Sequence, residues 1–170
     1  MEHGIIKALV MDVDGTLTDG KIYMSPQGEC VKAFHIKDGY MLARLADYHI
    51  APIIITGRQS DILLNRCKEL HITEVYQGIE NKKEKLTEVL RTLGCSFSEV
   101  AYIGDDLNDL ECMKLCGMSA CPADAVEDVI RNVDFVCSKK GGEGAVREFI
   151  EYIIKHNGKD KTVCGEMLQG

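Results

Sequence analysis

The sequence lacks any apolar run that approaches the roughly 20 residues needed to cross a membrane as a helix. Its first residues, Met-Glu-His-Gly, have neither the basic nor the apolar region of a secretory signal peptide. Together these absences predict a cytoplasmic protein with no membrane partner.

Positive charge is also scarce. The chain has 20 Lys and Arg residues against 27 Asp and Glu residues, which gives a formal net charge of −7. Because nucleic-acid-binding domains usually present a basic face, this balance predicts no nucleic-acid partner. An anionic small molecule remains compatible with the sequence where cations gather locally.

The eight cysteines contain no CxxC pair and no Cys/His cluster with the spacing of a zinc site. Several stand inside apolar runs, as Cys137 does after Phe135 and Val136. We therefore expect the cysteines to serve as small buried apolar side chains. A redox or metal pair formed by Cys112 and Cys116, four residues apart, is the alternative.

The 170 residues fit one domain that buries roughly 70% of the surface of its unfolded chain. We find no linker, repeat or low-complexity segment, so residues 1–156 are predicted to form this single domain. Residues 157–170 are polar and flanked by glycine, which predicts a flexible C-terminal tail. Docking of this tail on a neighbouring subunit is the alternative.

Short apolar segments alternate with helical patterns along the chain. Strands are expected at residues 5–10, 51–55, 74–77, 100–103 and 135–137, and helices at 38–46, from 60 or 61 onward, and at 82–93, 107–115, 123–132 and 143–155. Such alternation predicts an α/β fold with a mainly parallel sheet flanked by helices.

A small hairpin interrupts this pattern after the first strand. Two short apolar segments surround Ser25-Pro26-Gln27-Gly28, which predicts a β-hairpin flap over about residues 20–35. A hairpin of this size buries little by itself, so we expect it to lie against another surface or subunit.

The reactive side chains fall where predicted strands end. Asp12 and Asp14 follow the first strand, Thr56 the second, and Asp105 a later one, while Lys82 begins a helix at the same edge. Ligands of open α/β sheets bind outside the carboxyl ends of the strands. A set of acids there suits a hard divalent cation, and we expect Mg²⁺ held by Asp12, Asp14 and Asp105.

These residues together predict a phosphoryl-transfer site. Asp12 would attack phosphorus to give an aspartyl-phosphate, and Asp14 would act as general acid and then general base. Thr56 and Lys82 would hold the phosphate oxygens.

Each of these residue types also has a simpler structural explanation. Asp12 can stabilise a turn, Thr56 can cap a helix and Lys82 can be a surface lysine. Three polar residues after Asp105 are expected to support the metal site, or else to form a solvated acidic helix start; they are Asp106, Asn108 and Asp109.

In these motifs the sequence resembles the haloacid dehalogenase superfamily of phosphatases. Four motifs of that superfamily appear in order: Asp12-Val13-Asp14-Gly15-Thr16, Thr56-Gly57, Lys82 and Gly104-Asp105-Asp106-Leu107-Asn108-Asp109. The resemblance implies a Rossmann-like fold. Because only a hairpin separates the first two motifs, it also implies a member without a cap domain.

Further segments look like the cap-less branch that acts on 3-deoxy-D-manno-octulosonate 8-phosphate. That resemblance implies a homotetramer in which neighbouring subunits close each active site. It also implies a sugar-acid phosphate site lined by Asp14, His35, Ile36, Lys37, Asp38, Gly39, Thr56, Gly57, Arg58, Arg66 and Lys82.

The substrate expected from this resemblance has a rival. Glu143 looks more like relatives that act on nine-carbon N-acylneuraminate or KDN 9-phosphates, whereas Arg58 favours the octulosonate phosphate. The alternative to substrate binding is that Arg58 and Arg66 are simply exposed arginines of a helix. From a different class, a non-catalytic oligomerisation module is also considered, although every catalytic residue is present.

Overall fold

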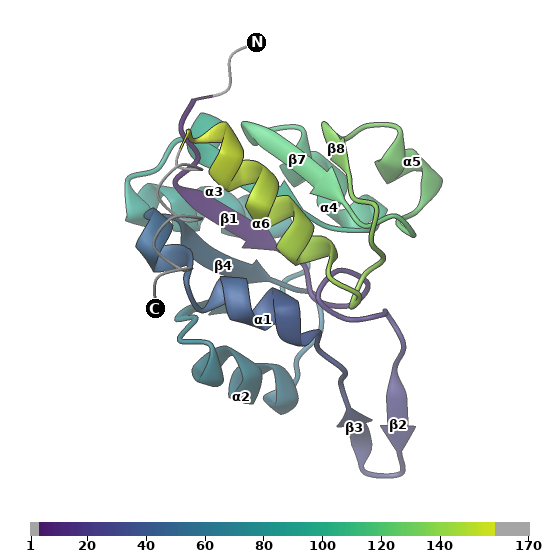
Figure 1. The fold of residues 1–170 in the computed structure, drawn as a ribbon. Helices are drawn as coiled ribbons and strands as arrows, with labels where there is room; N and C mark the ends of the chain where they lie inside the picture. Colours follow the sequence, from purple (N-terminus) through teal and green to yellow (C-terminus); the bar gives the residue numbers. More distant parts are fainter. Residues whose placement is uncertain (1–3, 159–170) are drawn as a thin grey trace, which may run out of the picture.

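The computed structural model describes residues 4–158 and contains a six-stranded sheet in the order β5-β4-β1-β6-β7-β8 (Figure 1). All five pairings in this sheet are parallel. The strands are β1 (Ala8–Met11), β4 (Ala51–Ile55), β5 (Glu74–Tyr76), β6 (Val100–Ile103), β7 (Met118–Cys121) and β8 (Phe135–Val136). The predicted α/β fold is confirmed.

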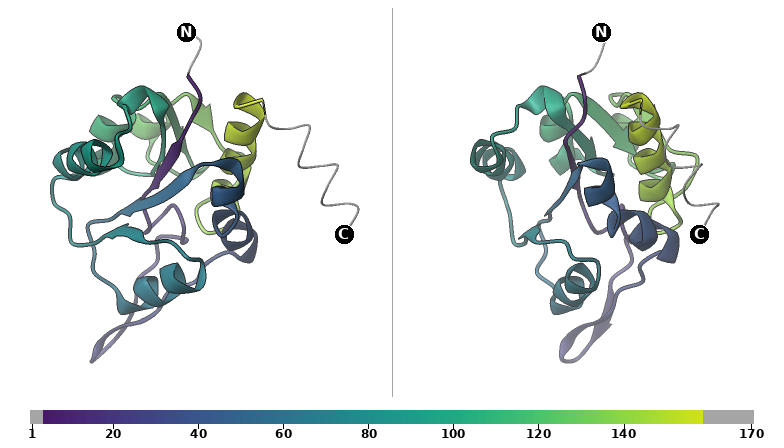
Figure 2. Two further views of the ribbon diagram at one scale, coloured as in Figure 1. Left: turned by 90° about the vertical axis from the view of Figure 1, so that its left-hand side faces the viewer. Right: turned by 60° about the vertical axis from the view of Figure 1, so that its left-hand side comes forward.

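Helices cover both faces of the sheet because each central strand is apolar on both sides. In β1, Leu9 and Met11 pack in one core, whereas Ala8 and Val10 pack in the other. The first core is covered by α1 (Ile36–Leu42), α2 (Asp61–Glu69) and α6 (Ala145–His156), the second by α3 (Lys82–Leu93), α4 (Leu107–Met113) and α5 (Glu127–Ile130). Figure 2 shows the teal α3 and the yellow α6 on opposite sides of the strands.

Capping residues fix where two site-forming helices begin. The Ser60 hydroxyl accepts a hydrogen bond from the Leu63 amide at 3.4 Å, and the Asn81 side chain accepts one from the Glu84 amide at 3.0 Å. Gly94 ends α3 in the left-handed conformation, with φ of 65°. Lys82 is consequently the first residue of α3, as predicted.

Some boundaries differ from the sequence prediction. The helix expected from residue 38 to 46 begins at Ile36 and ends at Leu42, and Leu45–Tyr48 form a separate 3₁₀ helix (η1). The left-handed His49, with φ of 57°, then turns the chain into β4. The helix expected at residues 123–132 is only four residues long, Glu127–Ile130. A second 3₁₀ helix, η2 (Phe97–Glu99), precedes β6.

The predicted hairpin forms a two-stranded antiparallel sheet of its own, β2 (Tyr23–Ser25) and β3 (Gly28–Val31). It projects away from the main sheet (Figure 1), and its strands expose apolar side chains, including Met24 at 62% and Val31 at 50%. We call residues 20–35 the flap.

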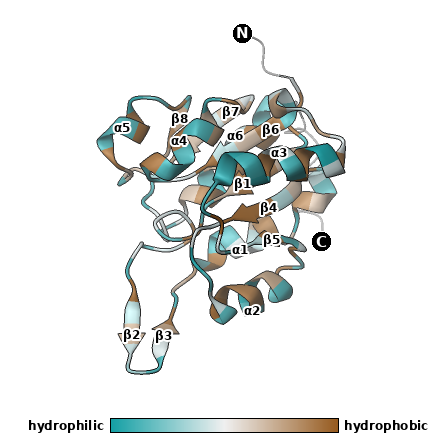
Figure 3. Cartoon of the chain, turned by 180° about the vertical axis from the view of Figure 1, so that it is seen from behind, coloured by the Kyte–Doolittle hydropathy of each residue, from teal (hydrophilic) through white to brown (hydrophobic). Residues whose placement is uncertain are grey.

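Apolar residues are concentrated in the strands, and polar residues face outward on the helices (Figure 3). Cys67, Cys112, Cys121 and Cys137 are buried, and burial raises the pKa of each thiol. The seven described cysteines are all free. Within residues 4–158, no helix is both long and apolar enough to cross a membrane.

The C-terminal tail predicted for residues 157–170 lies mainly outside the described residues. Asn157, its first residue, is the C-cap of α6, and its side-chain amide bonds to the Ile6 backbone amide at 2.9 Å and carbonyl at 2.8 Å. The ordered body therefore continues past the predicted boundary at residue 156.

Candidate active site

Three neighbouring strand ends bring distant segments to one edge of the sheet. Asp12 follows β1, Thr56 follows β4 and Asp105 comes two residues after β6. The Asp12 amide donates to the Ile103 carbonyl at 3.0 Å, which keeps the end of β1 in register with β6. Parallel strands place their carboxyl ends together, so this edge is where the fold holds ligands.

Three carboxylates from this edge form a compact acidic cluster. Asp12, Asp105 and Asp109 each place an oxygen atom within 4.8 Å of the others. Asp12 is 6% exposed and Asp109 is fully buried. Oxygen ligands in this number and of this charge suit a hard divalent cation such as Mg²⁺.

Lys82 neutralises part of this charge from the start of α3. Its buried ammonium donates to Asp12 Oδ1 and Asp109 Oδ1, both at 2.7 Å. Tyr102 in β6 donates its hydroxyl to the same Asp109 oxygen at 2.6 Å. Asp109 therefore anchors Lys82 beside Asp12.

Burial and mutual repulsion change the acidity of the cluster. Burial, together with Asp109, raises the pKa of Asp12 to about 6 despite the opposing effect of Lys82. Burial, Asp12 and Asp109 raise the pKa of Asp105 to about 7. Burial alone would lower the pKa of Lys82, but its two carboxylate partners raise it overall. The acids thus carry an electrostatic penalty that a bound cation would relieve.

The turn after β1 is packed directly against Asp105. The amides of Thr16, Leu17 and Thr18 all bond to the Val13 carbonyl, at 2.9 to 3.2 Å, and the Thr16 hydroxyl donates to Asp105 Oδ1 at 3.3 Å. Gly15 has φ of 94°, and a Cβ there would lie 2.0 Å from Asp105 Oδ2. Only glycine fits both requirements.

Asp14 lies in a different environment from the acidic cluster. Its carboxylate pairs with the Lys32 ammonium from the flap, and its second oxygen is 3.8 Å from Arg58 Nε. Lys32 also contacts Glu29 at 3.0 Å. Asp14 is absent from the cluster of Asp12, Asp105 and Asp109 because the chain turns after Val13 and does not stay extended.

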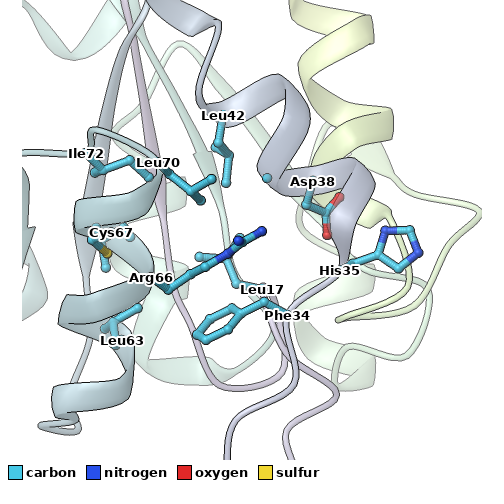
Figure 4. A pocket seen from close by; sticks show the side chains of 12 residues that line it. Leu17, Phe34, His35, Asp38, Leu42, Leu63, Arg66, Cys67, Leu70 and Ile72 are labelled. Carbon is cyan, nitrogen blue, oxygen red and sulfur yellow. The ribbon is translucent and has the colours of Figure 1, made fainter.

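A small cavity of about 10 Å³ lies between α1 and α2, next to the base of the flap. Figure 4 shows the Arg66 side chain extending from α2 toward α1, above Phe34 and on the side of Asp38. Three buried polar atoms of its lining residues lack a hydrogen-bond partner within the described chain: His35 Nδ1, Asp38 Oδ2 and Arg66 Nε.

The cavity is closely packed around its charged residues. Arg66 pairs with Glu69 at 2.8 Å, and a Cβ at Gly39 would lie 2.1 Å from Arg66 Nη2. Asp38 Oδ1 accepts the Arg147 amide at 2.7 Å, and burial raises the pKa of Asp38. Arg66 and the start of α1 thus form a second polar group beside the acidic edge.

Comparisons with known proteins place this arrangement in a family. Residues 68–150 match the haloacid dehalogenase-like hydrolase family. A relative from Escherichia coli K12, named 3-deoxy-D-manno-octulosonate 8-phosphate phosphatase KdsC, is 42% identical over 163 residues, which are 96% of this chain and 87% of the relative. The chain belongs to the haloacid dehalogenase-like hydrolases.

Solved structures of similar hydrolases have the same fold. A phosphatase of the same name from Yersinia pestis is 43% identical, with a TM-score of 0.89 over 92% of this chain and 85% of that one. The Moraxella catarrhalis phosphatase, solved with a magnesium ion, a phosphate ion and KDO, is 38% identical, with a TM-score of 0.90 over 95% and 93% of the two chains.

The structure of this hydrolase separates the residues predicted to bind substrate. Arg58 is 45% exposed in its side chain and lies beside Asp14, whereas Arg66 lines the cavity with His35, Asp38 and Gly39. Gly57 and Lys37 are exposed, and Ile36 is 72% exposed.

The residues predicted to support the metal site also occupy different places. Asp109 lies in the acidic cluster, whereas Asp106 is the N-cap of α4 and accepts the Leu107 amide at 2.7 Å. Asn108 is exposed in the first turn of that helix. The structure thus distinguishes one buried acid from its two exposed neighbours.

Sequence reasoning missed three side chains of the hydrolase site: Glu29, Lys32 and Tyr102. A lysine and a glutamate in a short hairpin have no sequence feature that distinguishes them from surface residues. Tyr102 is the one polar side chain of the apolar strand β6 (Val-Ala-Tyr-Ile), and that position was an available signal.

Proposed function

We propose that this chain is a Mg²⁺-dependent phosphatase that hydrolyses 3-deoxy-D-manno-octulosonate 8-phosphate to the free sugar acid and phosphate. The observation that carries the proposal is the buried Asp12 at the end of β1, held by Lys82 beside Asp105 and Asp109. The relatives named for this activity, and the related structure solved with magnesium, phosphate and KDO, support it.

The acidic edge provides the metal site. Asp12 and Asp105 are the proposed side-chain ligands, together with Asp14 of the same turn, while Asp106, Asn108 and Asp109 support them. A bound Mg²⁺ would offset the repulsion between carboxylate and phosphate and polarise the phosphoryl group. The raised pKa values of Asp12 and Asp105 fit a site that is completed by a cation.

Asp12 is the proposed nucleophile. Its carboxylate oxygen forms a bond to phosphorus while the bond from phosphorus to the sugar oxygen breaks, which leaves an aspartyl-phosphate. Asp14 gives a proton to the departing alkoxide and then takes one from the water that cleaves this intermediate. Lys82, Thr56 and Gly57 hold the phosphate oxygens during both steps.

Recognition of the sugar acid is assigned to two neighbouring groups. Arg58, partly exposed beside Asp14, is the proposed partner for the substrate's anionic groups, since a guanidinium binds a carboxylate through two parallel hydrogen bonds. His35, Asp38, Gly39 and Arg66 line the cavity between α1 and α2, and the exposed Ile36 and Lys37 of the same segment are proposed to complete the sugar-acid site. The unpartnered polar atoms of the cavity favour a polar occupant, and its volume of about 10 Å³ has room for about one water molecule.

Parallel assays test the substrate. With Mg²⁺ present, phosphate release from 3-deoxy-D-manno-octulosonate 8-phosphate should exceed release from N-acylneuraminate 9-phosphate and KDN 9-phosphate. Equal rates on these compounds, or negligible rates on all, would contradict the proposed substrate.

The proposal includes an assembly. Residues 1–156 act as one domain with the tail at 157–170, in a cytoplasmic homotetramer whose subunits close each other's sites. The exposed apolar side chains of the flap support an interface there. Light scattering of the purified protein measures the subunit number directly.

A further inference from the structure

The Lys32 side chain, at the base of the flap, places a buried ammonium group beside Asp14. Lys32 follows β3, and its side chain is only 1% exposed. The ammonium pairs with Asp14 Oδ1 and, at 3.0 Å, with Glu29 Oε1. A buried ammonium is stable only where such partners compensate for its lost hydration.

Glu29 fastens the same flap segment to the loop after β4. Its Oε2 accepts the Ser60 hydroxyl at 2.5 Å, and its Oε1 is 3.5 Å from Arg58 Nη2. Ser60 is itself held, because its amide donates to Gln77 Oε1 at 2.7 Å. The flap therefore reaches Asp14 through a chain of partners within one subunit.

This network distinguishes the two oxygen atoms of Asp14. Lys32 occupies Oδ1, whereas the neighbour of Oδ2 is the more distant Arg58 Nε at 3.8 Å. Oδ2 is consequently the oxygen left to exchange a proton with the leaving group or with water. Without Lys32, the carboxylates of Asp14 and Glu29 would retain only the more distant Arg58 as a cation that both contact within the described chain.

We propose that Lys32 is a positioning residue that fixes the orientation of the Asp14 carboxylate. Through Lys32, the flap of the same subunit becomes part of the catalytic geometry. The inference deepens the proposed function and rests on its assignment of Asp14 as the acid and base. Lys32 acts through Asp14 and is not itself assigned a contact with substrate.

Substrates with different leaving groups test this role. An alkoxide needs a proton as it departs, whereas p-nitrophenolate leaves readily without one. Lys32→Met should therefore lower kcat/KM for 3-deoxy-D-manno-octulosonate 8-phosphate on the order of tenfold more than for p-nitrophenyl phosphate, since positioned acid catalysis contributes about 10²–10⁴-fold. A loss that is equal for both substrates, or no loss, would overturn the proposal.

Two further variants make the result specific. Lys32→Arg keeps the cation and should recover most of the kcat/KM that Lys32→Met loses. An arginine variant as slow as the methionine variant would contradict the proposal. If Lys32→Met does not fold, Lys32→Arg serves as the test. Lys21→Met is the matched control, because Lys21 also belongs to the flap but is 72% exposed in its side chain. It should match the wild type.

Asp14→Asn separates the failure of this inference from the failure of the proposed function. Wild-type turnover by Asp14→Asn would remove the assignment of Asp14. If Asp14→Asn is inactive but Lys32→Met keeps the substrate preference of the wild type, the assignment of Asp14 stands and only the positioning role of Lys32 is refuted. The double variant should be no slower than Asp14→Asn alone, because residues that act as a unit are not additive.

Discussion

Gly15 shows how a single missing side chain shapes the site. A methyl group there would meet both an unfavourable backbone conformation and the Asp105 carboxylate. The glycine of the motif is thus required by the close approach of the turn to the acidic cluster.

Gly15→Ala should therefore abolish most phosphatase activity and lower the free energy of unfolding by about 1–3 kcal/mol, the usual range for a strained backbone position. Gly94→Ala is the matched control, because Gly94 also has a positive φ, of 65°, but nothing lies within 4 Å of its Cβ position. It should lose stability and keep activity. Phosphate release and thermal unfolding measure both, and an active Gly15→Ala would show that Asp105 can shift freely.

Asp12→Asn should remove turnover while the protein stays folded. The amide cannot attack phosphorus, whereas the buried carboxylate it replaces has a pKa raised to about 6 and so contributes little to stability when ionised. Phosphate release should fall to background with an unfolding temperature close to that of the wild type. Retained turnover would refute the nucleophile assignment.

Sequence patterns predicted the residues at strand ends but not how their side chains face one another. Asp12, Thr56 and Asp105 were found because each follows an apolar segment that the alternating strand and helix pattern predicts to be a buried strand. The sequence predicted Asp14 beside Asp12 as a metal ligand, but after the turn at Val13 the Asp14 carboxylate pairs with Lys32. Lys32 was missed because no local pattern says where a hairpin returns to the sheet.

At the scale of elements, the acidic edge is a joint product of β1, β6 and α4, since each supplies one carboxylate. Burial, followed by the repulsion between these acids, raises the pKa of Asp12 to about 6 and that of Asp105 to about 7, above the ordinary value of 3.8. The folded protein thus binds these protons more tightly than the unfolded chain does. The resulting destabilisation is complete above pH 7 and disappears as the pH falls toward 4.

Metal-free protein should accordingly have a higher unfolding temperature at pH 5.5 than at pH 8. Mg²⁺ should raise that temperature more at pH 8, because the cation binds ionised carboxylates. Thermal unfolding with and without Mg²⁺ at the two pH values measures this, and Asp105→Asn should weaken the dependence on both. An equal Mg²⁺ effect at the two pH values would contradict a site built from these acids.

The order of elements was predictable from hydrophobic patterns, whereas several boundaries were not. Gly94 predicted the end of α3 from sequence, and the structure adds Asn81 as the residue that caps its start. The region of η1 was read as one continuous helix because its apolar spacing continues past Leu42. The chain leaves the helical conformation at Arg44, with φ of −115° and ψ of 2°, and the apolar spacing gives no sign of this break.

For the whole molecule, the flap is the feature on which the proposed assembly depends. It projects from the body (Figure 1), and apolar side chains on both of its strands are exposed. A subunit that exposes them to water gains stability when a neighbour covers them.

A charged residue on the flap should weaken assembly. Met24→Glu, at a position 62% exposed, is expected to shift the proposed homotetramer toward smaller species, as measured by light scattering over a range of protein concentrations. Leu93→Glu on α3, 41% exposed, is the control and should leave the subunit number unchanged. An intact tetramer of Met24→Glu would show that the flap tip lies outside the interface.

The position of β1 between β4 and β6 has a consequence for the order of synthesis. Strand β1, which precedes the proposed nucleophile Asp12, comes before the other five strands of this sheet in the sequence, yet 70 residues separate Asp12 from Lys82 and 89 separate Thr16 from Asp105. In a growing chain, the pairing of Lys82 with both carboxylates and the cluster of Asp12, Asp105 and Asp109 therefore cannot form until residue 109 has left the ribosome. A nascent chain shorter than this holds an ordinary aspartate, and its reactivity begins only when the third strand of the edge has joined the sheet.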